Sequence, residues 1–148
     1  MRLWDWALEV YARQPVAEAC LHLQDAHGQN VPYLLWAAWM AGEGRSADLK
    51  PAARMMRTWG RRGRRPLRGV RRALKAPRPP VDEAAKAALR DAVKAVELKG
   101  ERVLMESLEA ISGPPGAPVP VLEGLIAAAE ASGDPLPPRC AGKAGRRS

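Results

Sequence analysis

The stretch LHLQDAHGQN, residues 21–30, holds the side chains of this sequence that are best suited to chemistry. His22, Asp25 and His27 are residue types that bind transition metals, and Cys20 precedes them as a candidate nucleophile. On a helix His22 and Asp25 share a face, whereas His27 lies well round the helix from His22. Cys20 and His22, two residues apart, point in different directions. The spacing therefore provides two metal ligands without a third, and it provides no catalytic pair.

The same stretch has the capping residues of a tight corner between two helices. Pro15 suits the first turn of one helix, which we expect to end at Gly28, a favourable residue for a left-handed C-cap. Asn30 is a good N-cap for the next helix, and Pro32 is tolerated in its first turn. We therefore interpret residues 21–30 mainly as a structural corner.

The elements around this corner are all predicted to be helical. Residues 31–40 are apolar nearly all round, which is typical of a central helix. Helical spacing of apolar residues also predicts helices over 2–13, 48–59, 67–74 and 82–112, and residues 120–131 are consistent with a last short helix. GRRGRRP and APRPP are expected to be breaks. The predicted fold class is all-α: a compact bundle in which the first, second and long helices pack around residues 31–40.

The long helix, about residues 82–112, is expected to face the bundle with one stripe of small and apolar residues. That stripe consists of Ala85, Leu89, Ala92, Val93, Val96, Gly100, Val103, Leu104, Ser107 and Ile111. Two of its glutamates, Glu97 and Glu101, are four residues apart and are candidate partners for Arg68 and Arg71 of the short basic helix. Exposed ion pairs of this kind contribute about 0–1 kcal/mol each.

Length and composition favour one domain in a reducing compartment. The chain has 148 residues, and we expect residues 1–131 to form a helical domain and 132–148 a disordered basic tail. The longest nearly apolar run covers about 12 residues, whereas a membrane span needs about 20. Cys20 and Cys140 lie in dissimilar settings, which favours reduced thiols over a disulfide. These features predict a cytoplasmic protein with no membrane span.

Positive charge is concentrated in one segment. The formal net charge is +8, but residues 49–81 contain no acidic side chain and hold 12 of the 24 basic ones. The rest of the chain has 12 basic and 16 acidic residues, a net charge of −4. Ten of the segment's basic residues are arginines, which can bind phosphate groups bidentately. The candidate anion-binding residues are Arg61, Arg62, Arg64, Arg65, Arg68, Arg71 and Arg72.

Three classes of function remain open on these residues. In the first, residues 54–78 bind nucleic acid or an acidic protein in a non-catalytic binding or adaptor role, although a solvated surface stretch explains the charge equally well. In the second, an enzyme pocket lies beside one polar stripe of the second helix, made of Glu18, His22, Asp25 and Gln29. In the third, the protein is an assembly subunit that uses exposed Trp or Ala-rich helix faces. No cofactor motif, metal site or catalytic residue is predicted.

Four segments of the chain carry a family resemblance. They are LWDWALEVYAR, VAEACLHLQDAHGQNVPYLLWAAW, the PLRGVRRAL that follows Trp59, and LRDAVKAVELKGERVLMESLE. In this order, over roughly residues 2–112, they resemble a small bacterial family of helical proteins of unknown function. The resemblance implies a compact, mostly helical cytoplasmic protein and supplies no activity, cofactor or site. GRRGRR and the C-terminal GKAGRRS look more basic than the family pattern, so an anion-binding role would be particular to this sequence.

Overall fold

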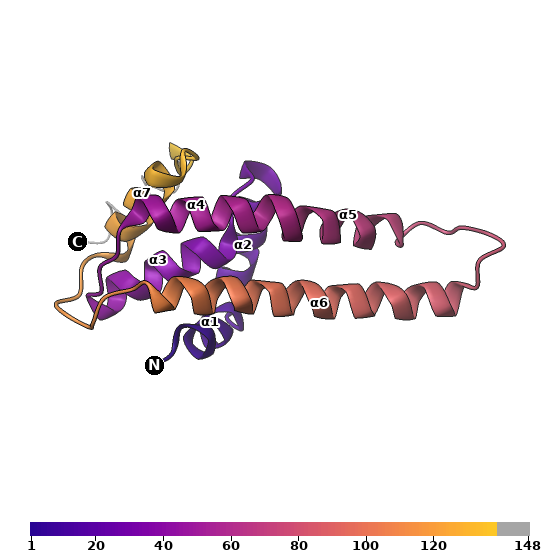
Figure 1. The fold of residues 1–148 in the computed structure, drawn as a ribbon, viewed down its shortest axis with the longest axis horizontal. Helices are drawn as coiled ribbons and strands as arrows, with labels where there is room; N and C mark the ends of the chain where they lie inside the picture. The colour runs from indigo at the N-terminus through magenta and orange to yellow at the C-terminus, as the bar shows by residue number, and fades with distance from the viewer. Residues whose placement is uncertain (139–148) are drawn as a thin grey trace.

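The computed structural model describes residues 1–138, which form helices joined by turns and loops (Figure 1). In chain order the elements are α1 (Leu3–Tyr11), α2 (Gln14–His27), α3 (Val31–Glu43), α4 (Leu49–Trp59), the π-helical turn η1 (Gly60–Arg64), α5 (Arg65–Ala73), α6 (Glu83–Ala110) and α7 (Val121–Ser132). No strand occurs in this part of the chain. The all-α prediction is confirmed. Among the same residues, no helix is both long enough and apolar enough to cross a membrane.

Helix α3 is the centre of the bundle, as its apolar sequence predicts. Ten of its 13 residues are buried, and α1, α2, α6 and α7 all pack against it. The most extensive of these contacts is with α7. Gly124 of α7 permits the close approach, because a Cβ atom there would lie 2.9 Å from the Cβ of Ala41. The sequence analysis did not assign α7 to the core, and in this respect the predicted bundle was incomplete.

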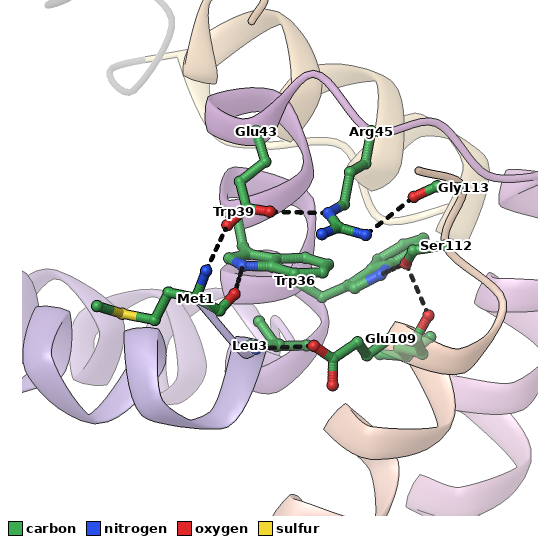
Figure 2. Close-up of polar contacts among 10 residues, drawn as sticks. Met1, Leu3, Trp36, Trp39, Glu43, Arg45, Glu109, Ser112 and Gly113 are labelled. Atoms are coloured by element: carbon green, nitrogen blue, oxygen red, sulfur yellow. Dashed lines mark hydrogen bonds and ion pairs between the residues drawn. The ribbon is translucent and has the colours of Figure 1, made fainter. Parts of the chain in front are cut away.

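The buried aromatic side chains of α3 each bond to a different part of the chain. Trp36 Nε1 donates to Ser112 Oγ at 2.8 Å, just beyond α6, and Trp39 Nε1 donates to the main-chain oxygen of Met1 at 3.1 Å (Figure 2). Tyr33 Oη donates to a main-chain oxygen of α7 at 2.7 Å. Burial raises the pKa of Tyr33 to about 12, so the phenol remains a donor at neutral pH. These bonds fix three surrounding segments in place around α3.

The loop between α6 and α7 is held against the C-terminal end of α3. Arg45 Nε pairs with Glu43 at 2.8 Å, and Arg45 Nη1 donates to the main-chain oxygen of Gly113 at 3.1 Å (Figure 2). Gly44 has a φ of 64°, and a Cβ atom there would lie 2.3 Å from the carbonyl of Gly116. Only glycine fits this position, because a side chain would collide with the backbone of the loop.

The helix caps predicted around the α2–α3 corner are confirmed, and Asp48 caps the start of α4. Gly28 ends α2 with a φ of 62°. The Asn30 side chain accepts from the main-chain N–H of Tyr33 at 3.0 Å, and Asp48 accepts from Lys50 N at 3.2 Å. Gly28 and Asn30 therefore form the predicted corner, whereas His22, Asp25 and His27 of the same stretch are exposed.

The predicted break at residues 60–66 is wrong, because η1 joins α4 to α5 as one continuous rod (Figure 1). The Arg65 N–H donates to the carbonyl of Gly60, five residues earlier. This wider turn helps to admit Pro66, which lacks an N–H and whose ring would clash with the carbonyl four residues before it in a regular α-helix. The two glycines cost roughly 1 kcal/mol each relative to alanine in a helix, but they do not end it.

The α5 helix and the N-terminal half of α6 run side by side and extend away from the bundle as a helical hairpin (Figure 1). Polar side chains hold the hairpin together. Arg71 of α5 pairs with Glu97 of α6 at 2.7 Å, which confirms one of the predicted interhelical pairs. Lys86 is 5% exposed and donates to the main-chain oxygen of Ala76 in the connecting loop.

The apolar stripe predicted to bury α6 is wrong over most of its length. Leu89, Val96 and Val103 are 53%, 50% and 47% exposed. Only near its C-terminal end does α6 bury large apolar side chains, among them Leu104 and Leu108. In the N-terminal half the covered positions are instead held by charged side chains: Lys86 bonds to the loop at Ala76, and Glu97 pairs with Arg71 of α5.

The segment after α7 begins in packed structure. Ser132 is buried at the end of α7, the main-chain oxygen of Asp134 accepts from Gln29 Nε2 at 2.8 Å, and Leu136 packs against the core. The remainder of the predicted basic tail, residues 139–148, lies outside the described residues, so its disorder stays a prediction.

We expect Trp36→Ala to destabilise the protein by about 3–5 kcal/mol, because it removes a fully buried indole and leaves a cavity. Its matched control is His22→Ala on the exposed face of α2, where a substitution typically changes stability by about 0.5 kcal/mol or less. Urea unfolding followed by circular dichroism measures both. Equal losses would show that α3 is not the enclosed helix.

Candidate anion-binding site

Five arginines of the α4–η1–α5 rod line one cleft of about 200 Å³, hereafter the arginine cleft. They are Arg57, Arg61, Arg64, Arg65 and Arg68. Steps of three and four residues bring side chains to the same side of a helical rod. Much of the rest of the lining comes from the α2–α3 corner, including Gly28 and Asn30, and from around the end of α7, where Ser132 and the acidic Asp134 lie. The corner residues thus contribute to the site by forming part of its wall.

The structure separates the seven predicted anion-binding residues into three groups. Arg61, Arg64, Arg65 and Arg68 line the arginine cleft. Arg71 is turned toward α6 by its ion pair with Glu97. Arg62 and Arg72 are exposed on the surface of the rod.

Arg57 is a cleft residue that the sequence analysis missed as a candidate. Its side chain also donates to the main-chain oxygen of Ser132 at 3.1 Å. The signal that could have identified it is its position four residues before Arg61 on the same helical rod, and it was overlooked because a break was expected between α4 and α5.

Arg64 lies at the boundary between the arginine cleft and a second cavity. Its Nη2 donates to Gln24 Oε1 of α2 at 2.9 Å. Burial lowers the pKa of Arg64, and the neighbouring charge of Arg68 lowers it further. The guanidinium nevertheless stays charged, since arginine does not lose its proton in proteins. A half-buried cation of this kind attracts an anion more strongly than a fully solvated one, because the lower dielectric around it strengthens the interaction.

The second cavity, hereafter the α6 pocket, has a volume of about 540 Å³ and lies between the rod and α6. Apolar and aromatic side chains from six helices, α1 to α6, form much of its wall. They are Tyr11, Leu21, Pro32, Trp59, Leu67, Leu98 and Leu104. Arg64, Arg68 and Glu101 are among its polar residues. Burial raises the pKa of Glu101, although the charges of Arg64 and Arg68 oppose this shift.

The four residues of the polar stripe proposed as an enzyme wall are not brought together at one cavity. Glu18, His22 and Asp25 are exposed on α2, whereas Gln29 is buried and lines the arginine cleft. The imidazole rings of His22 and His27 lie 5.2 Å apart in an edge-to-face arrangement, closer than the rotational argument predicts. Within residues 1–138, no group of three or more His, Cys, Asp or Glu side chains is placed to hold a metal ion.

Cys20 is partly buried and packs against the core. Burial raises the pKa of its thiol, which reduces the fraction of nucleophilic thiolate at neutral pH. This environment suits the interpretation of Cys20 as a small packing residue.

The Glu101 carboxyl should make stability depend on pH. The pKa of Glu101 is raised in the folded state. Its contribution to the free energy of unfolding is therefore fully present below the pKa of the unfolded chain, and it is lost as the pH rises through the pKa of the folded protein. We therefore expect Glu101→Gln to gain stability relative to the wild type between pH 4 and pH 7. Glu106→Gln, an exposed position on the same helix, controls for the lost charge. If Glu101→Gln instead loses stability relative to the wild type as the pH approaches 7, the pairing of the Glu101 carboxylate with Arg64 and Arg68 outweighs the cost of its burial.

Comparison with known proteins identifies one family for this chain. No curated protein and no solved structure matches the chain significantly. Residues 2–108, from the start of α1 to near the end of α6, match the family described as "Protein of unknown function (DUF2390)". The helix α7, which packs against α3, follows the matched region. Because the match covers most of the sequence, the chain belongs to the DUF2390 family of proteins of unknown function.

Proposed function

We propose that the protein is a cytoplasmic, non-catalytic binding protein that contacts the phosphate backbone of nucleic acid through the α4–η1–α5 rod. The observation that supports this most directly is the arginine cleft, in which five guanidinium groups gather on one side of a continuous helix. Guanidinium groups bind phosphate oxygens with charge-assisted, often bidentate, hydrogen bonds.

The length of the rod suits several consecutive phosphates. Arg54 and Arg72 are 18 residues apart, which on an α-helix corresponds to about 27 Å. Double-stranded DNA advances about 3.4 Å per base pair, so the rod spans roughly eight base-pair steps. The exposed arginines along it are Arg54, Arg57, Arg61, Arg62, Arg65 and Arg72.

The composition of the rod favours nucleic acid over an acidic protein. Protein–protein interfaces usually have an apolar or aromatic centre surrounded by a polar rim. The exposed side of the rod in residues 61–72 is dominated by arginine, and Val70 is its one large exposed apolar side chain among these residues. Such a surface is suited to phosphate contacts, which carry no direct sequence information. We therefore expect binding with little sequence preference.

The affinity for duplex DNA should depend steeply on salt. If about five phosphates are contacted, the slope of log K against log salt is about −4.5, and raising salt from about 50 to 200 mM weakens binding roughly 500-fold. Replacing Arg61, Arg65 and Arg72 with Gln should reduce the slope to about −1.8, because three phosphate contacts are lost. Fluorescence anisotropy with a labelled duplex of random sequence measures the slope.

The control variant removes the same charge elsewhere, by Arg13→Gln, Lys99→Gln and Arg102→Gln, all at exposed positions. It should leave the slope close to the wild-type value. Two results would contradict the proposal: no binding at low salt, or an equal loss of slope in both variants. Binding of an acidic polypeptide in place of the duplex would support the acidic-protein alternative instead.

A second candidate function is assembly, and the exposed apolar face of α6 is the observation that favours it. Leu89, Val96 and Val103 recur every seven residues and are each about half exposed, with Ala85 and Ala92 between or beside them. Apolar residues at this spacing form the contact line of paired helices. We infer that this face is the part of the surface best suited to a helix from another chain.

Self-association through α6 should appear as a concentration-dependent rise in the sedimentation coefficient without nucleic acid. Val96→Glu should abolish that rise while keeping helicity, because Val96 is exposed and removed from the core. Lys99→Glu on the same helix is the matched control for added negative charge. A single concentration-independent species in the wild type would rule out self-assembly through this face.

A further inference from the structure

The α6 pocket has the dimensions and composition of a small-molecule site and adjoins the arginine cleft at Gln24, Arg64 and Arg68, which line both. Its volume of about 540 Å³ falls within the roughly 300–1,000 Å³ typical of ligand sites. Such sites are mostly apolar with a few converging polar groups, as this pocket is. The cleft and the pocket share Arg64 and Arg68, but none of the exposed arginines proposed to contact nucleic acid lines the pocket.

The apolar wall explains why several large side chains are exposed in an otherwise well-packed region. Leu21, Trp59 and Leu98 are 48%, 38% and 52% exposed, and all three line the pocket. The Trp59 indole is anchored by a hydrogen bond from Nε1 to the main-chain oxygen of Gly100 at 3.0 Å. An anchored aromatic ring at a pocket wall provides a stacking surface for an apolar or aromatic ligand.

The charges of the pocket are not balanced. Arg71 and Glu97 are paired with one another. This leaves Arg64 and Arg68 facing the single carboxylate of Glu101, and Lys94 adds a further cation at the exposed edge. The Arg64 guanidinium uses one donor on Gln24 and has others available. The surplus of positive charge suits a ligand with one negative charge.

We propose that the α6 pocket binds a small organic carboxylate with an apolar body of about one or two rings. The body lies against Trp59 and the leucines, and the carboxylate accepts hydrogen bonds from Arg64 and Arg68. Glu101 faces the same group and disfavours ligands of higher negative charge, such as phosphate esters. A monoanion therefore fits this pocket better than the multiply charged backbone that suits the outside of the rod.

The first measurement compares 2-naphthoate with its neutral isostere 2-naphthamide by isothermal titration calorimetry on the full chain. Both probes bury the same rings, but only the carboxylate gains charge-assisted hydrogen bonds. We expect naphthoate to bind about ten-fold or more tightly than naphthamide. Equal affinities, or no binding of naphthoate at millimolar concentration, would overturn the proposal.

Two glycines of η1 provide a matched pair of variants that locate the site. Gly63 lines the α6 pocket and Gly60 lines the arginine cleft. Apart from its own residue, its chain neighbours and the adjacent backbone of its own helix, a Cβ atom at either position would have no atom within 4 Å, and neither glycine has a positive φ. Both are therefore suited to leucine, which is also a better helix former. Gly63→Leu should abolish naphthoate binding by filling the pocket, whereas Gly60→Leu should leave it unchanged.

The charge requirement is tested separately with Arg68→Gln. This variant should weaken naphthoate about ten-fold and leave naphthamide unchanged, since only the carboxylate uses the guanidinium. If Gly60→Leu rather than Gly63→Leu blocks naphthoate, the anion binds in the arginine cleft and the proposal is wrong. Gly63→Leu keeps every arginine of the rod, so loss of naphthoate binding with unchanged duplex binding separates this proposal from the nucleic-acid one.

Discussion

The complete enclosure of α3 is the constraint on which the rest of the structure depends. A helix with no polar face must be covered on every side, and its buried aromatic polar atoms must find hydrogen-bond partners. Trp39 takes its partner from the N-terminal segment, Trp36 from the end of α6, and Tyr33 from α7. Segments more than 100 residues apart in sequence are thereby brought to one helix. The bundle is consequently organised around α3 rather than around a symmetric set of helix pairs.

This arrangement determines where the candidate sites lie. Because only the C-terminal part of α6 is bound to the core, its N-terminal half projects with α5 as a hairpin (Figure 1). The hairpin has little apolar surface to bury between its helices, so ionic contacts such as Arg71–Glu97 hold it. The two cavities flank the rod where it leaves the bundle, and Arg64 lines both. One continuous rod therefore presents exposed arginines to solvent and the half-buried Arg64 and Arg68 to a pocket.

Local features of the fold were predictable from the sequence, and features that depend on distant partners were not. Gly28, Asn30 and Asp48 act within a few residues of themselves, so their capping roles can be inferred directly. The inward face of α6 was mispredicted because the burial of Lys86 depends on the loop that carries Ala76. The rod was mispredicted because Gly60, Gly63 and Pro66 normally indicate a break, whereas one wide turn accommodates them. Of the site, the concentration of arginine could be predicted, but its division between a cleft, a pocket and an ion pair required the structure.

The continuity of the α4–η1–α5 rod is the central claim, because both cavities and the row of exposed arginines exist only if residues 60–65 are helical. Amide hydrogen exchange followed residue by residue by NMR tests it most directly. We predict that the Arg65 amide, which donates to Gly60, exchanges as slowly as the amides in the middle of α4. Exchange of residues 61–65 near the rate of an unfolded chain, while α4 stays protected, would contradict the account and return this segment to a solvated basic loop.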